Sequence, residues 1–201
     1  MYLVARLSKC GVRMLPVTSR SSNSSAAIPT TVINFAPVNL ISAVGIDYGK
    51  LRNLLVRRQW KEADRETRAI MLYVSGRGQA SWLRTEDIES FPCEDLCTID
   101  QLWVRYSNRR FGFSVQKRIW HSIGGNKYAD YKTECCFSDQ VGWSVKGKLL
   151  GWNDFTFSLN APVGHLPGSL RFQNLLMGNV PLRIPYLLSS IAASLEKCNI
   201  Q

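Results

Sequence analysis

The most informative stretch of this chain is Tyr106-Ser-Asn-Arg-Arg-Phe-Gly-Phe-Ser-Val-Gln-Lys-Arg-Ile-Trp120. It sets aromatic side chains among arginines and lysines, and it contains no acid. Aromatic faces beside fixed cations suit a flat ligand with apolar faces and an anionic edge. A porphyrin fits this description, and so does a stacked nucleic-acid base. The stretch therefore predicts a binding function and leaves the class of ligand open.

The composition is that of a globular protein. The chain has 201 residues, of which 45% are hydrophobic and 20% are charged, which suits one domain with a sizeable core. No window approaches about 18 uninterrupted apolar residues, so the sequence predicts no membrane span. The net charge of +10 predicts an anionic partner, whether a nucleic acid, an acidic protein or a carboxylate ligand.

The first part of the chain differs from the rest. Residues 1–46 contain no acid and are rich in hydroxyl side chains, a composition typical of an organelle transit peptide. A disordered leader, or a start codon placed too early upstream of a bacterial domain, would give the same pattern. We expect a leader over residues 1–40 and a folded domain over residues 41–201.

The spacing of apolar residues predicts an all-α fold, a compact multi-helix domain. We expect a first helix capped by Asp47, a second from Trp60 that ends near Gly76, and a short helical turn at Thr85. A third long helix follows Pro92, a fourth is capped by Ser114, and a last one opens at Pro185. Residues 126–183 lack helical rhythm and carry many aromatic residues, which predicts one long irregular loop.

The residues that could carry chemistry form no recognisable catalytic or metal site. Six cysteines lie at positions 10, 93, 97, 135, 136 and 198, and their spacing favours reduced thiols in a reducing compartment, buried as small apolar residues. A zinc site is disfavoured because closely spaced ligand pairs in short loops are missing. His121 and His165 have no activating Ser or Cys partner, and no phosphate-binding loop is present. We therefore expect a binding protein rather than an enzyme.

A series of ordered motifs resembles the genomes-uncoupled-four family. It begins with Asp47-Tyr48-x-Lys50-Leu51-Arg52-x-Leu54-Leu55 and Trp60-Lys-Glu-Ala-Asp64, and continues with Phe91-Pro-Cys-Glu-Asp-Leu96. It then includes Arg110-Phe-Gly-Phe-Ser-Val-Gln116, Gly142-Trp143, Phe155-Thr-Phe157 and Ala161-Pro-x-Gly164-His-Leu-Pro167. The resemblance covers about residues 41–200, which is the whole expected domain.

The resemblance implies an all-helical domain shaped like a cupped hand, whose apolar palm binds protoporphyrin IX or Mg-protoporphyrin IX. It implies a non-enzymatic regulator that stimulates magnesium chelatase in chlorophyll biosynthesis, working with the large porphyrin-binding subunit of that enzyme. No integral metal is implied. We expect a monomer in the chloroplast or another plastid, with the cyanobacterial cytoplasm as the alternative, and peripheral membrane association without nucleic-acid binding.

The resemblance also implies a set of porphyrin-binding residues, with aromatic side chains in the palm and basic or loop residues at its rim. The set comprises Phe91, Phe111, Phe113, Arg118, Trp143, Phe157, His165, Leu166 and Arg171. The loop after Pro167 departs from chelatase regulators, since Arg171 precedes Phe172 where they carry Arg-Gly. Two alternatives follow: a tetrapyrrole-sensing signalling or scaffold protein without chelatase activation, and single-stranded nucleic-acid binding through residues 105–120.

Overall fold

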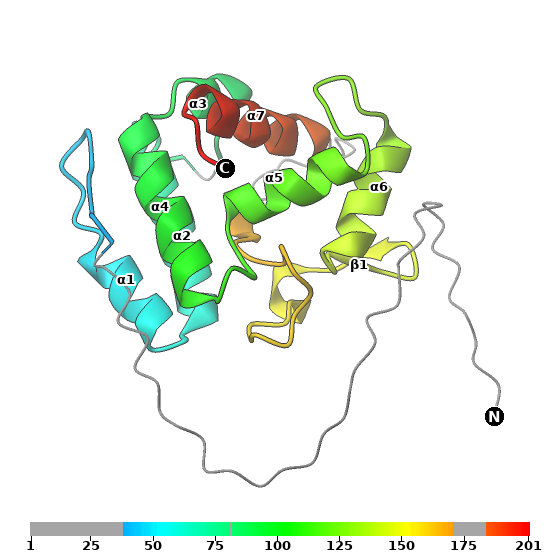
Figure 1. The fold of residues 1–201 in the computed structure, drawn as a ribbon, viewed down its shortest axis with the longest axis horizontal. Helices are drawn as coiled ribbons and strands as arrows, with labels where there is room; N and C mark the ends of the chain where they lie inside the picture. Colours follow the sequence, from blue (N-terminus) through cyan, green and yellow to red (C-terminus); the bar gives the residue numbers. More distant parts are fainter. Residues whose placement is uncertain (1–37, 81, 171–183) are drawn as a thin grey trace, which may run out of the picture. The chain divides into compact units, whose positions relative to one another are not determined.

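Seven α-helices and one small β-hairpin build the described part of the chain, residues 38–80, 82–170 and 184–201, in a computed structural model (Figure 1). The helices are α1 (Gly49–Val56), α2 (Trp60–Val74), α3 (Thr85–Glu89), α4 (Cys93–Tyr106), α5 (Phe113–Ser122), α6 (Tyr131–Gln140) and α7 (Ile184–Lys197). The strands β1 (Ser144–Val145) and β2 (Lys148–Leu149) pair antiparallel, and the 3-10 helix η1 spans Trp152–Asp154. The predicted all-helical fold class is confirmed.

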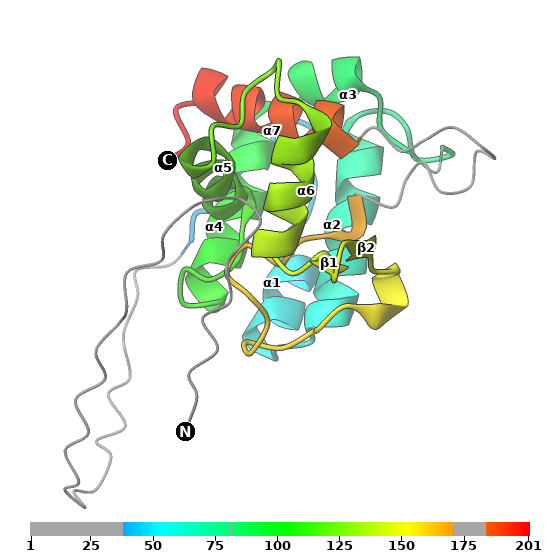
Figure 2. The same cartoon turned by 90° about the vertical axis from the view of Figure 1, so that its right-hand side faces the viewer.

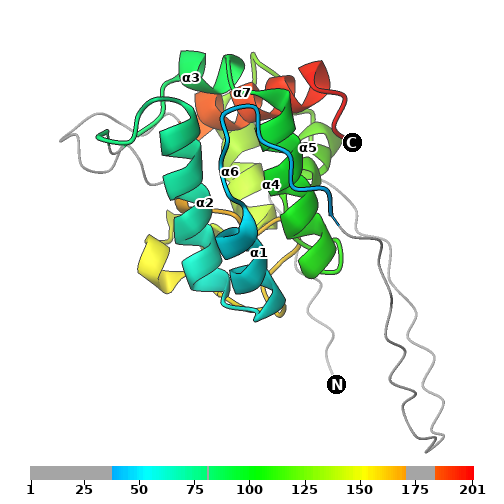
Figure 3. The same cartoon turned by 90° about the vertical axis from the view of Figure 1, so that its left-hand side faces the viewer.

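Helices α1, α2 and α4 form one side of the domain (Figure 3). Their apolar residues recur at helical spacing because one face of each helix is buried. On α2 this face includes Trp60, Ala63, Thr67, Ile70 and Met71. The ring of Trp60 stacks on that of Trp103 of α4, with centroids 6.0 Å apart. This packing confirms the predicted second and third helices.

An extended segment, residues 38–46, precedes α1 and runs along α4 (Figure 3). The buried carboxylate of Asp95 accepts hydrogen bonds from Ser42 Oγ at 2.6 Å, Ala43 N at 2.9 Å and Tyr48 Oη at 2.8 Å. Burial and the neighbouring Asp95 carboxylate raise the pKa of Tyr48. The packed part of the chain thus extends back to Val38, into the last residues of the leader expected over 1–40. Residues 1–37 lie outside the described residues, so a transit peptide there stays a prediction.

Helix α7 packs mainly against α3 and α5. Its buried residues Leu188, Ile191, Ala192 and Leu195 join the same core as α4 and α5. The helix begins at Ile184, so the predicted start at Pro185 is one residue late. Among the described residues, no helix is both long and apolar enough to cross a membrane.

The start of α5 holds the loop that follows η1. Gln116 Nε2 donates to Gly164 O at 2.9 Å and to Pro167 O at 2.8 Å, while Gly112 N donates to Leu166 O at 3.0 Å. Gln116 is buried, so these bonds lie away from water. The motif at residues 110–116 therefore fixes the backbone path of the motif at residues 161–167.

The predicted cap of α5 is wrong. Ser114 lies inside the helix, and its backbone N–H donates to Oδ1 of Asp100 on α4 at 2.8 Å. The N-terminus of α5 is thus capped by a side chain of α4. Gly112, the residue directly before α5, has a φ of +131°. Glycine is needed there because a Cβ would lie 2.8 Å from Val104 Cγ2 and 2.9 Å from Asp100 Oδ1.

The predicted irregular loop over residues 126–183 is wrong for its first half. Residues 131–140 form α6, capped by Asp130, whose side chain accepts a hydrogen bond from Thr133 N at 2.8 Å. The hairpin β1–β2 follows directly (Figure 2). Helix α6 packs Phe137 between Trp120 and Trp143, with ring centroids 5.8 Å and 5.4 Å apart.

The expectation that all cysteines are reduced thiols is also wrong. Cys93 of α4 and Cys198, directly after α7, form a disulfide across 105 positions of sequence, with their Cα atoms 5.3 Å apart. Cys97 and Cys135 are free thiols. Spacing along the chain gave no signal for this bond because the two helices become neighbours only in the fold.

Candidate ligand-binding groove

A groove of about 420 Å³ opens beside α2. Its lining comes from one face of α2, from η1 and from the chain after Pro167: Arg65, Arg68, Ala69, Leu72, Trp152 and Ser169. This volume falls within the range of sites that hold small organic ligands. The combination of an indole ring, apolar atoms and guanidinium groups suits a flat, anionic ligand.

Trp152 is held in place by a buried carboxylate. Its Nε1 donates to Oδ2 of Asp64 at 2.7 Å, and its ring meets that of Phe157 edge-on, with centroids 5.2 Å apart. An aromatic side chain anchored at its polar atom loses little further rotational freedom when a ligand stacks on it. Trp152 therefore forms a preorganised wall of the groove.

Asp64 also holds the chain after Pro167, which contributes Ser169 to the lining of the groove. Its Oδ1 accepts from Gly168 N at 2.7 Å and Ser169 N at 3.2 Å, and its backbone carbonyl accepts from Ser169 Oγ at 2.9 Å. Burial raises the pKa of Asp64, and the donors from Trp152, Gly168 and Ser169 oppose this rise. One fully buried residue of α2 thus positions two segments far from it in sequence.

Three cations follow one face of α2, at positions 61, 65 and 68. The guanidinium carbon of Arg65 lies 4.6 Å from the centroid of the Trp152 ring, and Nζ of Lys61 lies 4.9 Å from it. Lys61 also lies 5.6 Å from the Phe157 ring centroid. Arg68 lines the groove itself. The aromatic wall is consequently bordered by positive charge.

The porphyrin-binding residues expected from the resemblance fall into different environments. Phe91, Phe111, Phe113, Trp143 and Leu166 are core residues, exposed by 4% or less. Phe157 is half-buried, and its ring contacts that of Trp152, which lines the groove. Arg118 is exposed on α5. Burial raises the pKa of Asp100, and the positive charge of Arg118 opposes this rise. Arg171 lies outside the described residues.

The expectation of an exposed aromatic surface over residues 105–120 is wrong for three of its rings. Phe111, Phe113 and Trp120 are 0–1% exposed, because they belong to the core: Phe111 packs on Trp60 and Trp103, and Trp120 packs on Phe137 of α6. Nucleic-acid bases could not stack on these rings in this structure. Whether the buried members of the expected set contact a ligand directly stays a prediction.

His165 is buried with both ring nitrogens engaged. Its Nε2 accepts from Thr156 N at 3.2 Å, and its Nδ1 lies 2.8 Å from Val141 O, which it reaches as the donor. Trp143 Nε1 donates to His165 O at 2.8 Å. This arrangement gives His165 a positioning role for the loop. Within the described ranges, no group of three or more His, Cys, Asp or Glu residues could hold a metal ion.

Sequence reasoning missed the residues that shape the groove. Asp64 and Trp152 are 88 positions apart, and no local pattern joins them. The spacing of Lys61, Arg65 and Arg68 was the one available signal, since residues four and three positions apart share a helix face. That pattern was hidden because Glu62 and Glu66 alternate with the cations.

The model of the family described as GUN4-like matches residues 41–180. This chain belongs to the GUN4-like family. The resemblance expected from the motifs is therefore confirmed, and so is the fold: the structure of GUN4 from Chlamydomonas reinhardtii superposes with a TM-score of 0.61 at 29% identity, covering 78% of this chain and 93% of that one.

Further GUN4-like relatives extend the comparison. The ligand-free structure of Arabidopsis thaliana GUN4 superposes with a TM-score of 0.58 at 28% identity, over 74% of this chain and 96% of that one. The Ycf53-like protein of Synechocystis is 39% identical over 131 residues, 64% of this chain and 53% of its own length. The chloroplastic tetrapyrrole-binding protein of Arabidopsis thaliana is 31% identical over 58% of this chain and 46% of its own.

The sources and the lengths of these relatives can both be compared with this GUN4-like chain. The relatives belong to a cyanobacterium and to a chloroplast, so the expected plastid or cyanobacterial location is confirmed. The chain spans about half the length of the curated relatives it matches.

Proposed function

We propose that this GUN4-like chain binds a tetrapyrrole, protoporphyrin IX or Mg-protoporphyrin IX, and stimulates magnesium chelatase without catalysing a reaction itself. The observation that supports the binding step best is the wall formed by Trp152, anchored on Asp64 and bordered by Lys61 and Arg65. A porphyrin needs an aromatic or apolar surface for its macrocycle and cations for its propionates. The groove offers both on one side of α2.

The geometry suggests how each part would act. One face of the macrocycle would stack on Trp152, with the ring of Phe157 at its edge. Arg65 now lies over the Trp152 ring, so it would move aside and pair with a propionate. Arg68 would hold the second propionate, since a guanidinium group binds a carboxylate through two parallel hydrogen bonds. Leu72 would contact the apolar rim.

The proposed partner is the large porphyrin-binding subunit of magnesium chelatase, in chlorophyll biosynthesis. A protein that delivers the porphyrin or shields the photoreactive product handles the substrate and lowers no chemical barrier. Such a role fits membership of the GUN4-like family and the name of the tetrapyrrole-binding relative. We expect the protein to act as a monomer that associates peripherally with membranes.

Tryptophan fluorescence quenching by deuteroporphyrin tests the binding step. We expect saturable quenching by the full chain, and about tenfold weaker binding for Arg65→Ala and for Arg68→Ala, each of which removes a charge-assisted hydrogen bond. Arg118→Ala separates the groove from the binding set that the resemblance implies, because this exposed arginine belongs to that set but lies on α5 and does not line the groove. Equal loss in Arg118→Ala, or unchanged binding in both groove variants, would contradict the assignment of the groove.

A sensing or scaffold role without chelatase activation is the second candidate. It is favoured by the sequence after Pro167, where Arg171 precedes Phe172 rather than a glycine. A magnesium chelatase assay with and without this protein separates the two candidates. Stimulation supports the first candidate, and saturable porphyrin binding without stimulation supports the second.

A further inference from the structure

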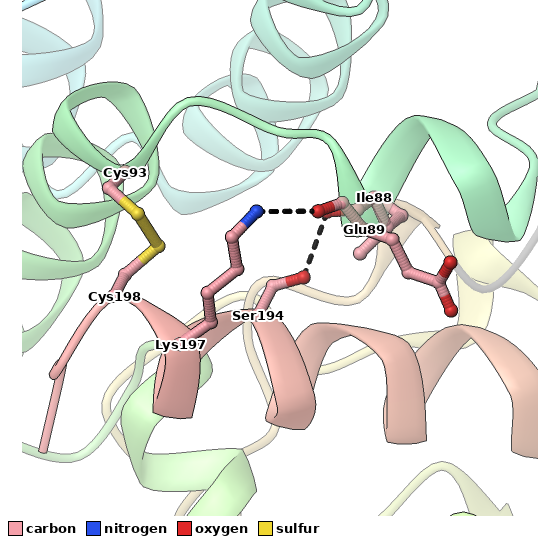
Figure 4. The surroundings of a disulfide bond; sticks show 6 residues. All are labelled: Ile88, Glu89, Cys93, Ser194, Lys197 and Cys198. Atoms are coloured by element: carbon pink, nitrogen blue, oxygen red, sulfur yellow. Dashed lines mark hydrogen bonds between the residues drawn. A yellow bond between two sulfur atoms is a disulfide. The ribbon is translucent and has the colours of Figure 1, made fainter.

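We propose that the Cys93–Cys198 disulfide is a reversible redox-modification site, opened by a protein dithiol of the thioredoxin type and controlling how tightly the C-terminal helix is held. The bond joins the first residue of α4 to the residue directly after α7 (Figure 4). Neither cysteine is fully buried, since each residue keeps part of its surface in contact with solvent. Reduction requires that a thiolate can approach the bond from that side.

The compartment in which the protein is expected distinguishes this bond from a disulfide whose role is purely structural. Glutathione and thioredoxin keep thiols reduced in intracellular compartments, where disulfides are usually transient, catalytic or redox-sensing. A disulfide between two helices of a protein from such a setting is expected to exchange with these reductants. Its persistence would then depend on the redox state of the compartment.

The exchange is balanced as a two-electron step. A thiolate of the reductant attacks Sγ of Cys198 and forms a mixed disulfide, while Cys93 leaves as a thiolate. Cys93 is the first residue of α4, where the unpaired N–H groups of the helix stabilise negative charge. The second thiol of the reductant then releases Cys198. The protein ends with two thiols after uptake of two protons, and the reductant ends as a disulfide.

The contacts around the bond make the change reversible. Lys197 Nζ donates to Glu89 O at 3.1 Å, and Ser194 Oγ donates to Ile88 O at 2.8 Å (Figure 4). Leu195 is fully buried in the core. These interactions remain after reduction, so α7 stays docked on α3 and the two thiols stay near each other. Reduction should therefore loosen the C-terminal end without unfolding the domain.

Cys97 provides an internal control. It lies one turn after Cys93 on α4, is also half-buried and is a free thiol. Burial raises its pKa, and the nearby Asp100 carboxylate raises it further. Cys97 is thus held as a neutral thiol and should not compete in the exchange.

The experiment uses the oxidised full chain, equilibrated with reduced thioredoxin and dithiothreitol buffers over a range of potentials. Alkylation followed by peptide mapping reports the state of Cys93 and Cys198, and thermal unfolding is followed in parallel. We expect both cysteines to become modified together in a single two-electron transition. Reduction should lower the Tm by about 10 °C, because the bond closes a loop of over a hundred residues.

The variants separate the switch from other thiol effects. Cys93→Ser and Cys198→Ser should show the lower Tm with or without reductant, while Cys97→Ser should behave as the parent chain does. Two outcomes would overturn the proposal. One is full alkylation of Cys93 and Cys198 in protein isolated and kept without reductant. The other is a bond that thioredoxin reduces only once the protein has been unfolded.

Discussion

The indole of Trp152 donates a 2.7 Å hydrogen bond to the buried carboxylate of Asp64, 88 positions earlier in the chain. The same carboxylate accepts the backbone N–H groups of Gly168 and Ser169. Two of the segments that line the groove are therefore positioned by one side chain of α2. A change at Asp64 should alter the groove and the stability together, whereas a change at Trp152 should act mainly on the ligand.

Trp152 can be tested by paired substitutions. Trp152→Ala removes the aromatic wall and should weaken deuteroporphyrin binding about tenfold. Trp152→Phe keeps a ring but loses the bond to Asp64, so its affinity should lie between those of the parent chain and Trp152→Ala. Quenching of the remaining tryptophans measures both. Equal affinities for all three proteins would show that the ligand does not stack on this residue.

Gln116 should be important for stability rather than for ligand contact. Gln116→Ala leaves the carbonyl groups of Gly164 and Pro167 buried without their donor, which should cost about 3 kcal/mol of unfolding free energy. Urea denaturation measures the loss. The control is Gln140→Ala at the exposed end of α6, which should change stability by less than about 0.5 kcal/mol.

Gly112 should tolerate no side chain. A Cβ there meets Val104 and Asp100 at under 3 Å, in a backbone conformation with φ of +131°. Gly112→Ala should therefore destabilise the fold by about 3 kcal/mol. Gly78→Ala is the matched control, since no atom lies within 4 Å of a Cβ at that position. Similar melting temperatures for the two variants would contradict this explanation.

Asp87 should make stability depend on pH at the start of α3. Its carboxylate accepts from Arg84 N at 2.8 Å and from Arg84 Nη2 at 2.6 Å, and the Arg84 side chain lowers the pKa of Asp87. A carboxyl group whose pKa is lower in the folded state stabilises the fold above its unfolded pKa of about 3.9. That contribution disappears as the pH falls through the folded-state pKa.

The variant Asp87→Asn tests this dependence. It should reduce the free energy of unfolding by about 1 kcal/mol at pH 7. At pH values below the folded-state pKa of Asp87 the two proteins should converge, because the parent carboxyl group is then protonated. Chemical denaturation at several pH values gives the comparison. A difference that stays constant from pH 7 to the acid range would exclude an ionic origin.

The sequence was sufficient for the helices with a clear apolar face. Helices α2 and α4 were predicted because Trp60, Ile70, Ile99 and Trp103 recur at helical spacing and are buried. Helix α6 was missed because its sequence, YKTECCFSDQ, buries Phe137 as its one large apolar side chain. A pattern with so few apolar positions gives no reliable helical period.

The long-range features could not be predicted from local patterns. The cap of α5 comes from Asp100, and the disulfide partner of Cys93 lies 105 positions away. The family motif around Gly112 and Gln116 was interpreted as a ligand-binding surface, although its residues hold the 161–167 loop. The basic and aromatic composition of that motif was informative about family membership, and less so about which side chains are exposed.

The partners of Asp64 have a consequence for the order in which the protein can fold. Gly168 and Ser169 leave the ribosome more than a hundred residues after Asp64. Until Trp152 and then Gly168 and Ser169 have been synthesised, water must satisfy the Asp64 carboxylate, so α2 cannot bury its full face before most of the chain has been made. The domain must therefore fold late, after nearly all of it has been synthesised, and its nascent chain should depend on chaperones that cover the exposed apolar face of α2.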